Sequence, residues 1–220
     1  QAQLRQQRFV SRVSHELRTP MNAIMGFIQS PPQALLSKPE NQALFGAMRN
    51  ASKHLMTVID DLMDFSRLQT GELKITPIET RLDQLTREIS QIFSNQLAER
   101  GVAFKLKVDP RIPDVALVDP NRYAQILINL LSNAAKFTTE GEVGLTVEVR
   151  PAPETIQTLD RIWIRVTVTD TGIGIESDQL DQLFEAFTPS NNRTNNAFGG
   201  SGLGLSTSKK LVELMGGEIS

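Results

Sequence analysis

Cysteine is absent from this 220-residue chain, which excludes disulfide bonds, zinc–thiolate sites and cysteine nucleophiles. The absence fits a reducing compartment, and we expect a cytoplasmic location for this module, whether or not the full-length protein is anchored in a membrane. No apolar run approaches the roughly 20 residues of a membrane span, and no signal peptide is visible. A formal net charge of −2 gives no general reason to expect nucleic acid or an anionic membrane as a partner.

The remaining composition is ordinary for a soluble globular protein, with 40% apolar and 22% charged residues. The length suggests one or two domains. The chain begins with Gln1 inside a polar helical pattern and stops at Ser220, just after a predicted helix end at residues 216–217. We therefore expect a fragment of a longer protein, with any sensor or membrane segment outside it.

Two amphipathic helices are predicted in the first third of the chain. The first covers residues 1 to about 29, and the second follows breaks at 30–32 and 38–39. Each carries one apolar stripe with spacings of three and four residues. The stripes consist of Val10, Val13, Leu17, Met21, Ile24 and Ile28, and of Leu44, Met48, Ala51, Leu55, Val58, Leu62 and Phe65. An antiparallel hairpin of this size buries little alone, so we expect a homodimeric four-helix bundle.

A domain boundary is predicted at Gly71, which ends the second helix. It divides the chain into a helical hairpin at 1–71 and a second domain at 72–220. In the second domain, alternating patterns predict strands at 73–75, 102–108, 115–118, 142–149 and 162–169, and helices at 81–99, 120–137, 177–186 and 203–215. This order predicts an α/β sandwich with helices on one face of a mixed sheet, and therefore an α+β fold for the whole chain.

His15 is the first candidate functional residue, because it stands beside the carboxylate of Glu16 and four residues before Thr19. At 100° per residue, His15 lies on the side of the helix opposite the apolar stripe, and Thr19 shares its face. Pro20 cannot donate a hydrogen bond to the carbonyl of Glu16, so the helix should bend beside the histidine. Another domain can approach an exposed histidine on such a helix. The alternative is a surface histidine on a dimerisation helix.

The helix predicted at 120–137 has a polar face. Asn129 and Asn133 are four residues apart, and Lys136 follows three residues later, so the two amides lie on one side of the helix. Amide oxygens suit a hydrated Mg²⁺, and a lysine ammonium suits phosphate oxygens. An ordinary solvent-facing helix surface has the same pattern, so the motif alone leaves both interpretations open.

Two glycine-rich segments follow. In the segment 170–175, the carboxylate of Asp170 at a strand end can accept a hydrogen bond from the exocyclic amine of adenine, although such sequences also make simple turns. The segment 199–205 opens the last helix, where backbone N–H groups favour an anion, but it is neither a Walker loop nor a dinucleotide fingerprint. The two phenylalanines in 183–187 between these segments also fit simple core packing.

Together these motifs resemble the transmitter module of two-component sensor histidine kinases over essentially the whole chain. The resemblance rests on the segment 9–21 around His15 and on the segments 129–137, 170–175, 183–187 and 199–205, which stand in the order of that family. It implies a dimerisation and phosphotransfer hairpin, followed by a Bergerat-type ATP-binding domain that is truncated at its C-terminus.

The resemblance also implies roles for individual residues. His15 would be the phosphorylated residue and Glu16 its acid/base partner, while Thr19 would orient a water that dephosphorylates a regulator. The cofactors would be ATP and Mg²⁺, with Asn129 and Asn133 near the metal. The residues assigned to ATP binding are Asn129, Asn133, Lys136, Phe137, Asp170, Gly172, Gly174, Ile175, Phe187, Gly200, Gly202, Leu203, Gly204 and Leu205.

The implied activity is autophosphorylation of a histidine from ATP, followed by transfer to an aspartate of a response regulator receiver domain. The resemblance implies no contact of this fragment with nucleic acid or a membrane. Two other function classes remain open. An ATPase of the related gyrase, mismatch-repair and chaperone group would need a glutamate where this chain has Asn129. A non-catalytic dimerising module is favoured only by the segment 188–198, in which Arg193 is the single cation.

Overall fold

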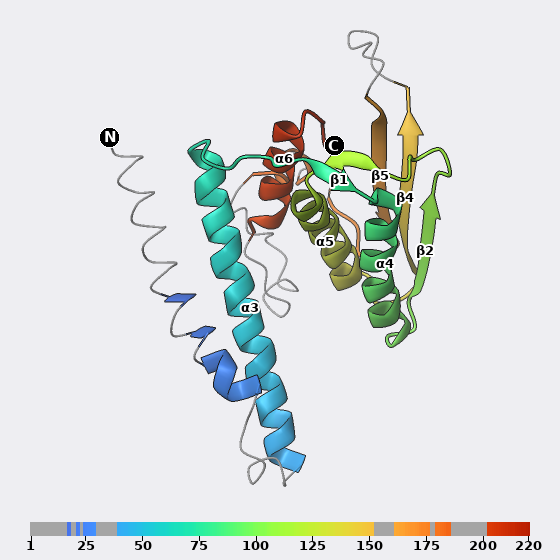
Figure 1. The fold of residues 1–220 in the computed structure, drawn as a ribbon. Coiled ribbons are helices and arrows are strands. Elements are labelled where there is room, and N and C mark those ends of the chain that lie inside the picture. Colours follow the sequence, from blue (N-terminus) through green and yellow to red (C-terminus); the bar gives the residue numbers. More distant parts are fainter. Residues whose placement is uncertain are drawn as a thin grey trace. The chain divides into compact units, whose positions relative to one another are not determined.

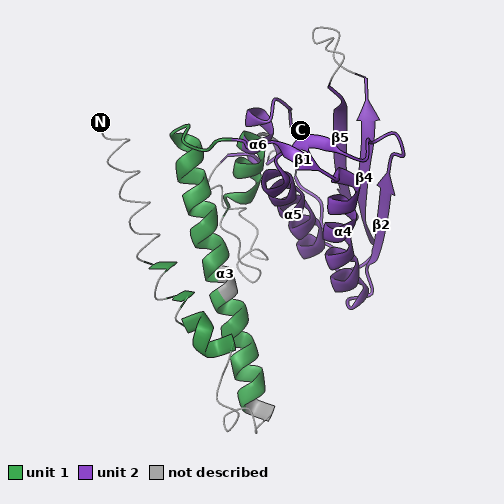
Figure 2. Ribbon diagram, viewed as in Figure 1, with its two compact units in different colours: residues 1–74, 186–210 green, residues 75–185, 211–220 purple. Residues whose placement is uncertain are grey.

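The computed structural model describes residues 17–18, 21–22, 24–29, 39–151, 161–176, 179–185 and 202–220. The chain divides into two compact units, coloured separately in Figure 2. One unit comprises residues 1–74 and 186–210, and the other comprises residues 75–185 and 211–220. Among the described residues, no helix combines the length and apolar character needed to cross a membrane.

The first unit contains the helical hairpin. Helix α3 (Pro39–Gln69) is its long helix, and the described residues at 17–18, 21–22 and 24–29 are helical as well. Arg18 forms an ion pair with Asp60, and the guanidinium of Arg49 donates to the carbonyl oxygen of Ile28 at 3.3 Å. Because the earlier residue contacts the later part of α3, the two helical segments run antiparallel, as predicted.

The predicted apolar stripe of the first helix is partly buried, with Met21 and Ile28 buried. The stripe predicted for the second helix is wrong in its buried positions, because α3 buries Ile59 and Met63, which the prediction left out, and no residue of the predicted stripe is buried. Phe27, also outside the predicted stripes, is 79% exposed. In the described part of the hairpin, the other exposed large apolar side chains are Leu17, Ile24, Leu44, Met48 and Leu55. A single hairpin therefore leaves substantial apolar surface uncovered, which favours association with a further apolar surface.

The second unit consists of two small sheets and the helices packed on them (Figure 1). Its elements are β1 (Ile78–Thr80), α4 (Leu82–Ala98), β2 (Ala103–Val108), β3 (Ala116–Val118), α5 (Pro120–Phe137), β4 (Glu142–Arg150), β5 (Trp163–Asp170) and a 3₁₀ turn, η1 (Leu180–Gln182). Strands β1 and β3 form an antiparallel pair. The main sheet has the order β2-β4-β5, in which β4 is parallel to β2 and antiparallel to β5.

The core of this unit lies between the main sheet and helices α4 and α5. Val143, Leu145 and Val147 alternate along the central strand β4 and are fully buried, because every second side chain of a strand faces the helices. Helix α5 contributes Leu127 and Leu131, which are 1% and 0% exposed. Burial of each such side chain stabilises the fold by about 1.5–3 kcal/mol. The opposite face of the sheet carries polar side chains, including Lys105 and Lys107 of β2.

Helix α5 begins at a well-defined cap. Asp119 is buried, and its Oδ1 accepts hydrogen bonds from the backbone N–H groups of Asn121 and Arg122, both at 3.1 Å. Its Oδ2 accepts a third from Thr76 N at 2.9 Å. Pro120 occupies the first turn of the helix. Backbone N–H groups in that turn have no acceptor within the helix, so a proline there breaks no helical hydrogen bond. One carboxylate thus fixes the start of α5 and ties the segment before β1 to it.

Most of the predicted elements are confirmed to within one residue at each end, including α4, α5, β3, β4 and β5. The strand predicted at 73–75 is wrong, since the strand is Ile78–Thr80, paired with β3. Of the short helix predicted at 177–186, the described part forms only the 3₁₀ turn Leu180–Gln182. The helix predicted at 203–215 is confirmed as α6 (Gly204–Leu214), and the division between the two units falls within it. Trp163, the single tryptophan, begins β5 and is half-buried.

Candidate nucleotide site

Asp170 is the last residue of β5 and its side chain is exposed. Its Oδ1 accepts a hydrogen bond from Gly172 N at 2.9 Å, which closes a small turn after the strand. Within the described part of the chain, this is the only hydrogen bond to the Asp170 carboxylate. A carboxylate has about four acceptor positions, so most of its acceptor capacity remains available to a ligand.

The glycine at 172 is required by a close approach of two backbone segments. A Cβ on Gly172 would clash with the carbonyl oxygen of Phe137 and with Oδ1 of Asp170. The turn after β5 therefore lies directly against the C-terminal end of α5. Gly174 has a φ of 72°, the left-handed conformation that glycine adopts without strain. Ile175 is about half exposed beside it.

Thr171, which the sequence analysis gave no role, anchors this turn to the sheet. Its Oγ1 accepts a hydrogen bond from Glu142 N at 3.0 Å, and its own N–H donates to the carbonyl oxygen of Glu142 at 3.1 Å. Gly141 has a φ of 99°, and a Cβ there would clash with the Thr171 side chain. A threonine before a glycine is too common a sequence for this role to have been inferred.

The polar face of α5 is present as predicted. Asn129, Asn133 and Lys136 are half-buried, and they lie opposite the buried residues Leu127 and Leu131 of the same helix. This face leads along the helix to the end that contacts Gly172. The structure therefore brings the asparagine segment and Asp170 together within one unit, joined through Phe137.

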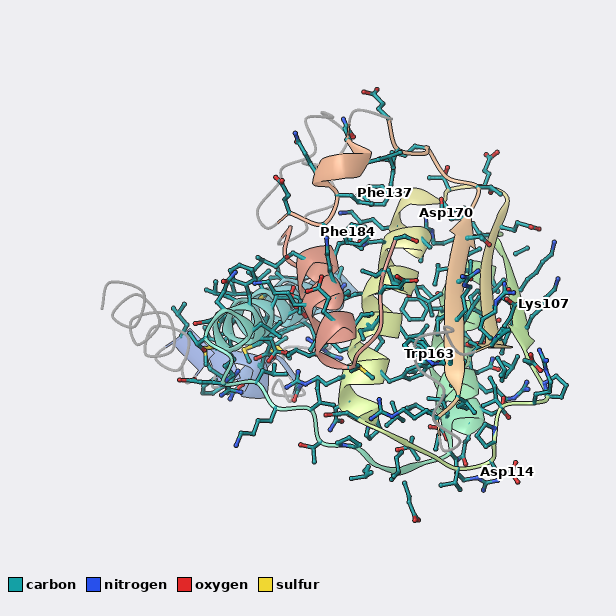
Figure 3. All side chains as sticks on the ribbon, turned by 90° about the horizontal axis from the view of Figure 1, so that it is seen from above. Lys107, Asp114, Phe137, Trp163, Asp170 and Phe184 are labelled. Carbon is teal, nitrogen blue, oxygen red and sulfur yellow. The ribbon has the colours of Figure 1, made fainter. Side chains whose placement is uncertain are left out.

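The C-terminal end of α5 holds two further predicted residues. Lys136 Nζ lies 4.7 Å from the centre of the Phe137 ring. Partial burial lowers the pKa of Lys136, because removal from water disfavours its charged form. Figure 3 shows Phe137 near Asp170, with Trp163 at the other end of β5. An anionic group placed near Lys136 would favour its charged form.

Arg100 is a second residue that sequence reasoning missed. It lies in the turn after α4, and its guanidinium donates to the carbonyl oxygens of Ala135 at 2.6 Å and Thr138 at 3.0 Å. Carbonyls in the last turn of a helix have no partner within the helix, and a positive charge there is favourable. No local pattern marks Arg100, because its partners are 35 and 38 residues away.

The second glycine-rich segment belongs to the helical unit in its described part. Gly202 has a φ of 66° and Leu203 is buried, with Gly204 and Leu205 half-buried at the start of α6. Lys210 of the same helix lies 5.3 Å from the ring of Phe65 in α3. The predicted site residues His15, Glu16, Thr19, Phe187 and Gly200 lie outside the described residues.

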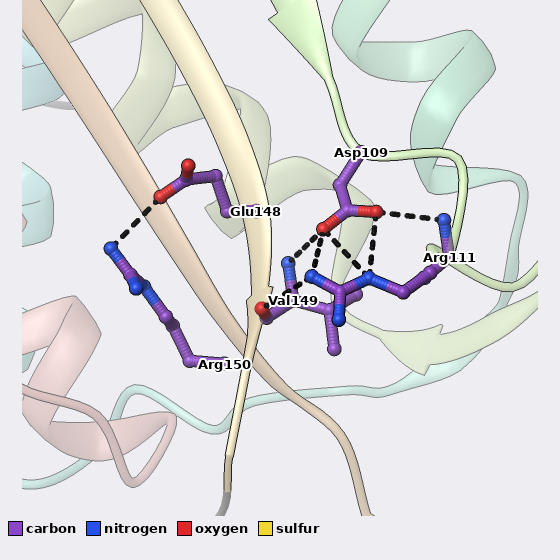
Figure 4. Close-up of polar contacts among 5 residues, drawn as sticks. All are labelled: Asp109, Arg111, Glu148, Val149 and Arg150. Carbon is purple, nitrogen blue, oxygen red and sulfur yellow. Dashed lines mark hydrogen bonds and ion pairs between the residues drawn. The ribbon is translucent and has the colours of Figure 1, made fainter.

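A second aspartate occupies the other end of the main sheet (Figure 4). Asp109 follows β2, and both of its carboxylate oxygens accept hydrogen bonds from Arg111, through the guanidinium and the backbone N–H. Val149 N adds another at 3.3 Å. The Arg111 side chain holds the pKa of Asp109 well below its usual range, and Asp109 in turn raises the pKa of Arg111. Glu148 and Arg150 form a neighbouring ion pair at 3.0 Å.

Two family models match the chain. Residues 5–71 match the His Kinase A (phospho-acceptor) domain, and residues 118–220 match the histidine kinase-, DNA gyrase B- and HSP90-like ATPase domain. The chain therefore belongs to the class of proteins in which a phosphoacceptor domain is followed by an ATPase-type domain. In that order the two domains are characteristic of one family, and the chain belongs to the sensor histidine kinases.

Similar proteins support this family. The chain is 35% identical over 212 residues to the signal transduction histidine-protein kinase BarA of Escherichia coli, and 38% identical over 216 residues to the virulence sensor protein BvgS of Bordetella bronchiseptica. These alignments cover 96% of the chain but only 22% and 17% of the relatives' lengths.

Two solved structures resemble the chain as well. Full-length ShkA in complex with AMPPNP aligns with a TM-score of 0.72 at 28% identity, over 95% of this chain and 41% of that one. The Acinetobacter baumannii histidine kinase AdeS aligns with a TM-score of 0.57 at 20% identity, over 91% of this chain and 86% of that one, which supports the fold alone.

Proposed function

We propose that this chain is the catalytic module of a protein-histidine kinase, which phosphorylates His15 from ATP and passes the phosphoryl group to an aspartate of a response regulator receiver domain. Two domains would share this work: the hairpin of residues 1–71 carries the phosphoacceptor, and residues 72–220 bind ATP. The observation that carries the proposal is the exposed Asp170 carboxylate, held against the end of the polar face of α5.

The hydrogen-bond donors and acceptors of residues 72–220 match those of ATP. Asp170 accepts a hydrogen bond from the exocyclic amine of adenine, and the backbone at Gly172 and Gly174 lies beside the base. Lys136 pairs with phosphate oxygens, which offsets the cost of its partial burial. Asn129 and Asn133 offer the amide oxygens that suit a hydrated Mg²⁺. When bound, Mg²⁺ neutralises charge on the phosphate oxygens.

By the family resemblance, the remaining predicted residues would bind ATP as well. Phe137 and Ile175 flank the turn at Gly172, and the segment Gly202–Leu205 supplies backbone N–H groups at the start of α6. Phe187 belongs to the segment 183–187, and Gly200 belongs to the glycine-rich segment 199–205.

In the phosphoacceptor half, a ring nitrogen of His15 attacks the γ-phosphorus, the bond from phosphorus to the bridging oxygen breaks, and ADP leaves. Glu16 takes the proton, or accepts a hydrogen bond, from the other ring nitrogen and so makes the imidazole a better nucleophile. The phosphoramidate formed is labile enough to phosphorylate a carboxylate. Thr19, one turn further along the helix, orients a water for the return reaction on the regulator.

We further propose that the module is a cytoplasmic homodimer, assembled through the hairpin. The exposed apolar residues of the hairpin, Phe27 and Leu55 among them, are surface that a second copy would bury in a four-helix bundle.

Hydrolysis of ATP by this chain as its main activity is disfavoured by its own residues. The related ATPases use a glutamate to activate water at the position of Asn129, and an amide cannot act as a general base. A non-catalytic module would bind the nucleotide and transfer nothing.

Labelling with ATP that carries a radioactive γ-phosphate tests all three functions. We expect label on the protein that is stable in alkali and labile in acid, as a phosphoramidate is. The chain has two histidines, so His54→Gln is a matched control for His15→Gln. Label should be lost in the His15 variant and kept in the control. Release of free phosphate without labelled protein would support the ATPase instead, and neither product would support the non-catalytic module.

A further inference from the structure

We infer that Arg100 is a positioning residue for adenine recognition, although it stands outside every motif of the chain. The inference rests on the proposed function, because it assumes that Asp170 accepts a hydrogen bond from adenine. Arg100 itself does not touch the nucleotide. It acts through the end of α5, whose backbone supports the turn that carries Asp170.

The first step is the contact between Arg100 and α5. The two donors of its guanidinium bind the carbonyl oxygens of Ala135 and Thr138, at 2.6 Å and 3.0 Å. These two carbonyls stand on either side of Lys136 and Phe137. A planar guanidinium fixes two acceptors in one geometry, which a lysine ammonium does not. Arg100 thus holds the last turn of α5 at both ends.

The second step is the contact between α5 and the turn after β5. The carbonyl oxygen of Phe137 lies so close to Gly172 that no side chain fits at that position. Gly172 N in turn donates to Asp170 Oδ1 at 2.9 Å. A shift of the α5 end therefore moves Gly172, and Gly172 orients the carboxylate. No other charged side chain is hydrogen-bonded to these carbonyls within the described part of the chain.

This chain of contacts predicts a specific defect. Hydrogen bonding depends steeply on geometry, so a carboxylate that is held less firmly loses discrimination before the rest of the site loses affinity. The measured quantity is the ratio of two dissociation constants: that of purine riboside triphosphate, which lacks the exocyclic amine, divided by that of ATP. An unfolded fraction removes sites for both nucleotides equally and leaves this ratio unchanged.

The test is isothermal titration of the whole chain with each nucleotide. In the wild type, a hydrogen bond to a charged acceptor should make the ratio about tenfold to a hundredfold. Arg100→Met should lower the ratio at least threefold, and Arg100→Lys should give an intermediate value. Arg87→Met is the matched control, since Arg87 is an exposed arginine of α4 that pairs with Asp83 at 2.9 Å. Its ratio should equal that of the wild type.

The outcomes separate this inference from the proposed function. A wild-type ratio near one would overturn the adenine assignment of Asp170, and the inference with it. A wild-type preference for ATP that persists in Arg100→Met would overturn the inference alone. If Arg100→Met does not fold, Arg100→Lys decides: a reduced ratio supports the positioning role, and an unchanged ratio refutes it.

Discussion

Asp109 directly follows β2 and Asp170 ends β5 of the same sheet, but their carboxylates have different surroundings. Since β2 and β5 run in opposite directions, the two residues lie at opposite ends of the sheet. Asp109 accepts hydrogen bonds from Arg111 and Val149 on both oxygens. Asp170 accepts one, from Gly172, within the described part of the chain. The Asp109 carboxylate therefore uses its acceptor positions in contacts within the protein, whereas most acceptor positions of the Asp170 carboxylate remain available to a ligand.

This difference separates a structural acid from a ligand-binding one. Asp119 is a structural acid like Asp109, because its two carboxylate oxygens accept hydrogen bonds from three backbone N–H groups. The local sequence cannot make the distinction, since all three aspartates directly follow a β-branched residue: Val108, Val118 or Thr169. The number of acceptors already used within the protein does make it.

The largest effect that tests the comparison is on nucleotide affinity. Asp170→Asn should weaken ATP binding about tenfold to a hundredfold, because the amide can turn its NH₂ toward the adenine amine and lose the acceptor. The thermal unfolding midpoint should change little. Titration calorimetry measures the first quantity and a melting curve the second. Asp109→Asn is the matched control and should leave the ATP affinity unchanged. Equal losses of ATP affinity in both variants would contradict the distinction between a structural Asp109 and a ligand-binding Asp170.

A smaller effect, on stability, is expected at the buried cap of α5. Asp119→Ala should lower the free energy of unfolding by about 1–2 kcal/mol, because a helix cap is lost and Thr76 N loses its partner. Asp119→Asn should lose less, since one amide oxygen can still cap the helix. Urea denaturation measures both variants. If the alanine variant were as stable as the wild type, the role of Asp119 in the fold would be wrong.

The smallest effect concerns pH. The folded protein holds the pKa of Asp109 below its usual value of 3.8, chiefly through the Arg111 side chain. The unfolded chain therefore binds a proton first as the pH falls, and the stabilisation present above that value is lost below it. The stability difference between the wild type and Asp109→Asn should be constant near neutral pH and should shrink below about pH 4. A difference that stays constant down to pH 2 would contradict the shifted pKa.

Sequence periodicity predicted most of the fold because its signals are local. Helix α5 and strands β4 and β5 carry strong apolar patterns, and their bounds follow from the residues themselves. The misplaced strand had no such signal. Residues 73–75 alternate as well as residues 78–80 do, and only the pairing with β3, about 38 residues away, selects the latter.

The candidate site was predictable to the same extent. The sequence indicated Asp170 and the face with Asn129, because both belong to recognisable motifs. It could not indicate Thr171 or Arg100. Their partners, Glu142 and the carbonyl of Ala135, are backbone groups brought close by the tertiary fold. A side chain that binds backbone leaves no complementary residue type in the sequence.

The single tryptophan offers a practical consequence of this geometry. Trp163 begins β5 and Asp170 ends it, so the two side chains are separated by most of a strand, or about 23 Å at roughly 3.3 Å per residue. The indole is half-buried in the sheet. Its fluorescence should therefore follow the unfolding of the sheet without responding directly to a nucleotide at the far end. One intrinsic chromophore can thus report stability in the presence of ATP, with no dye and no added label.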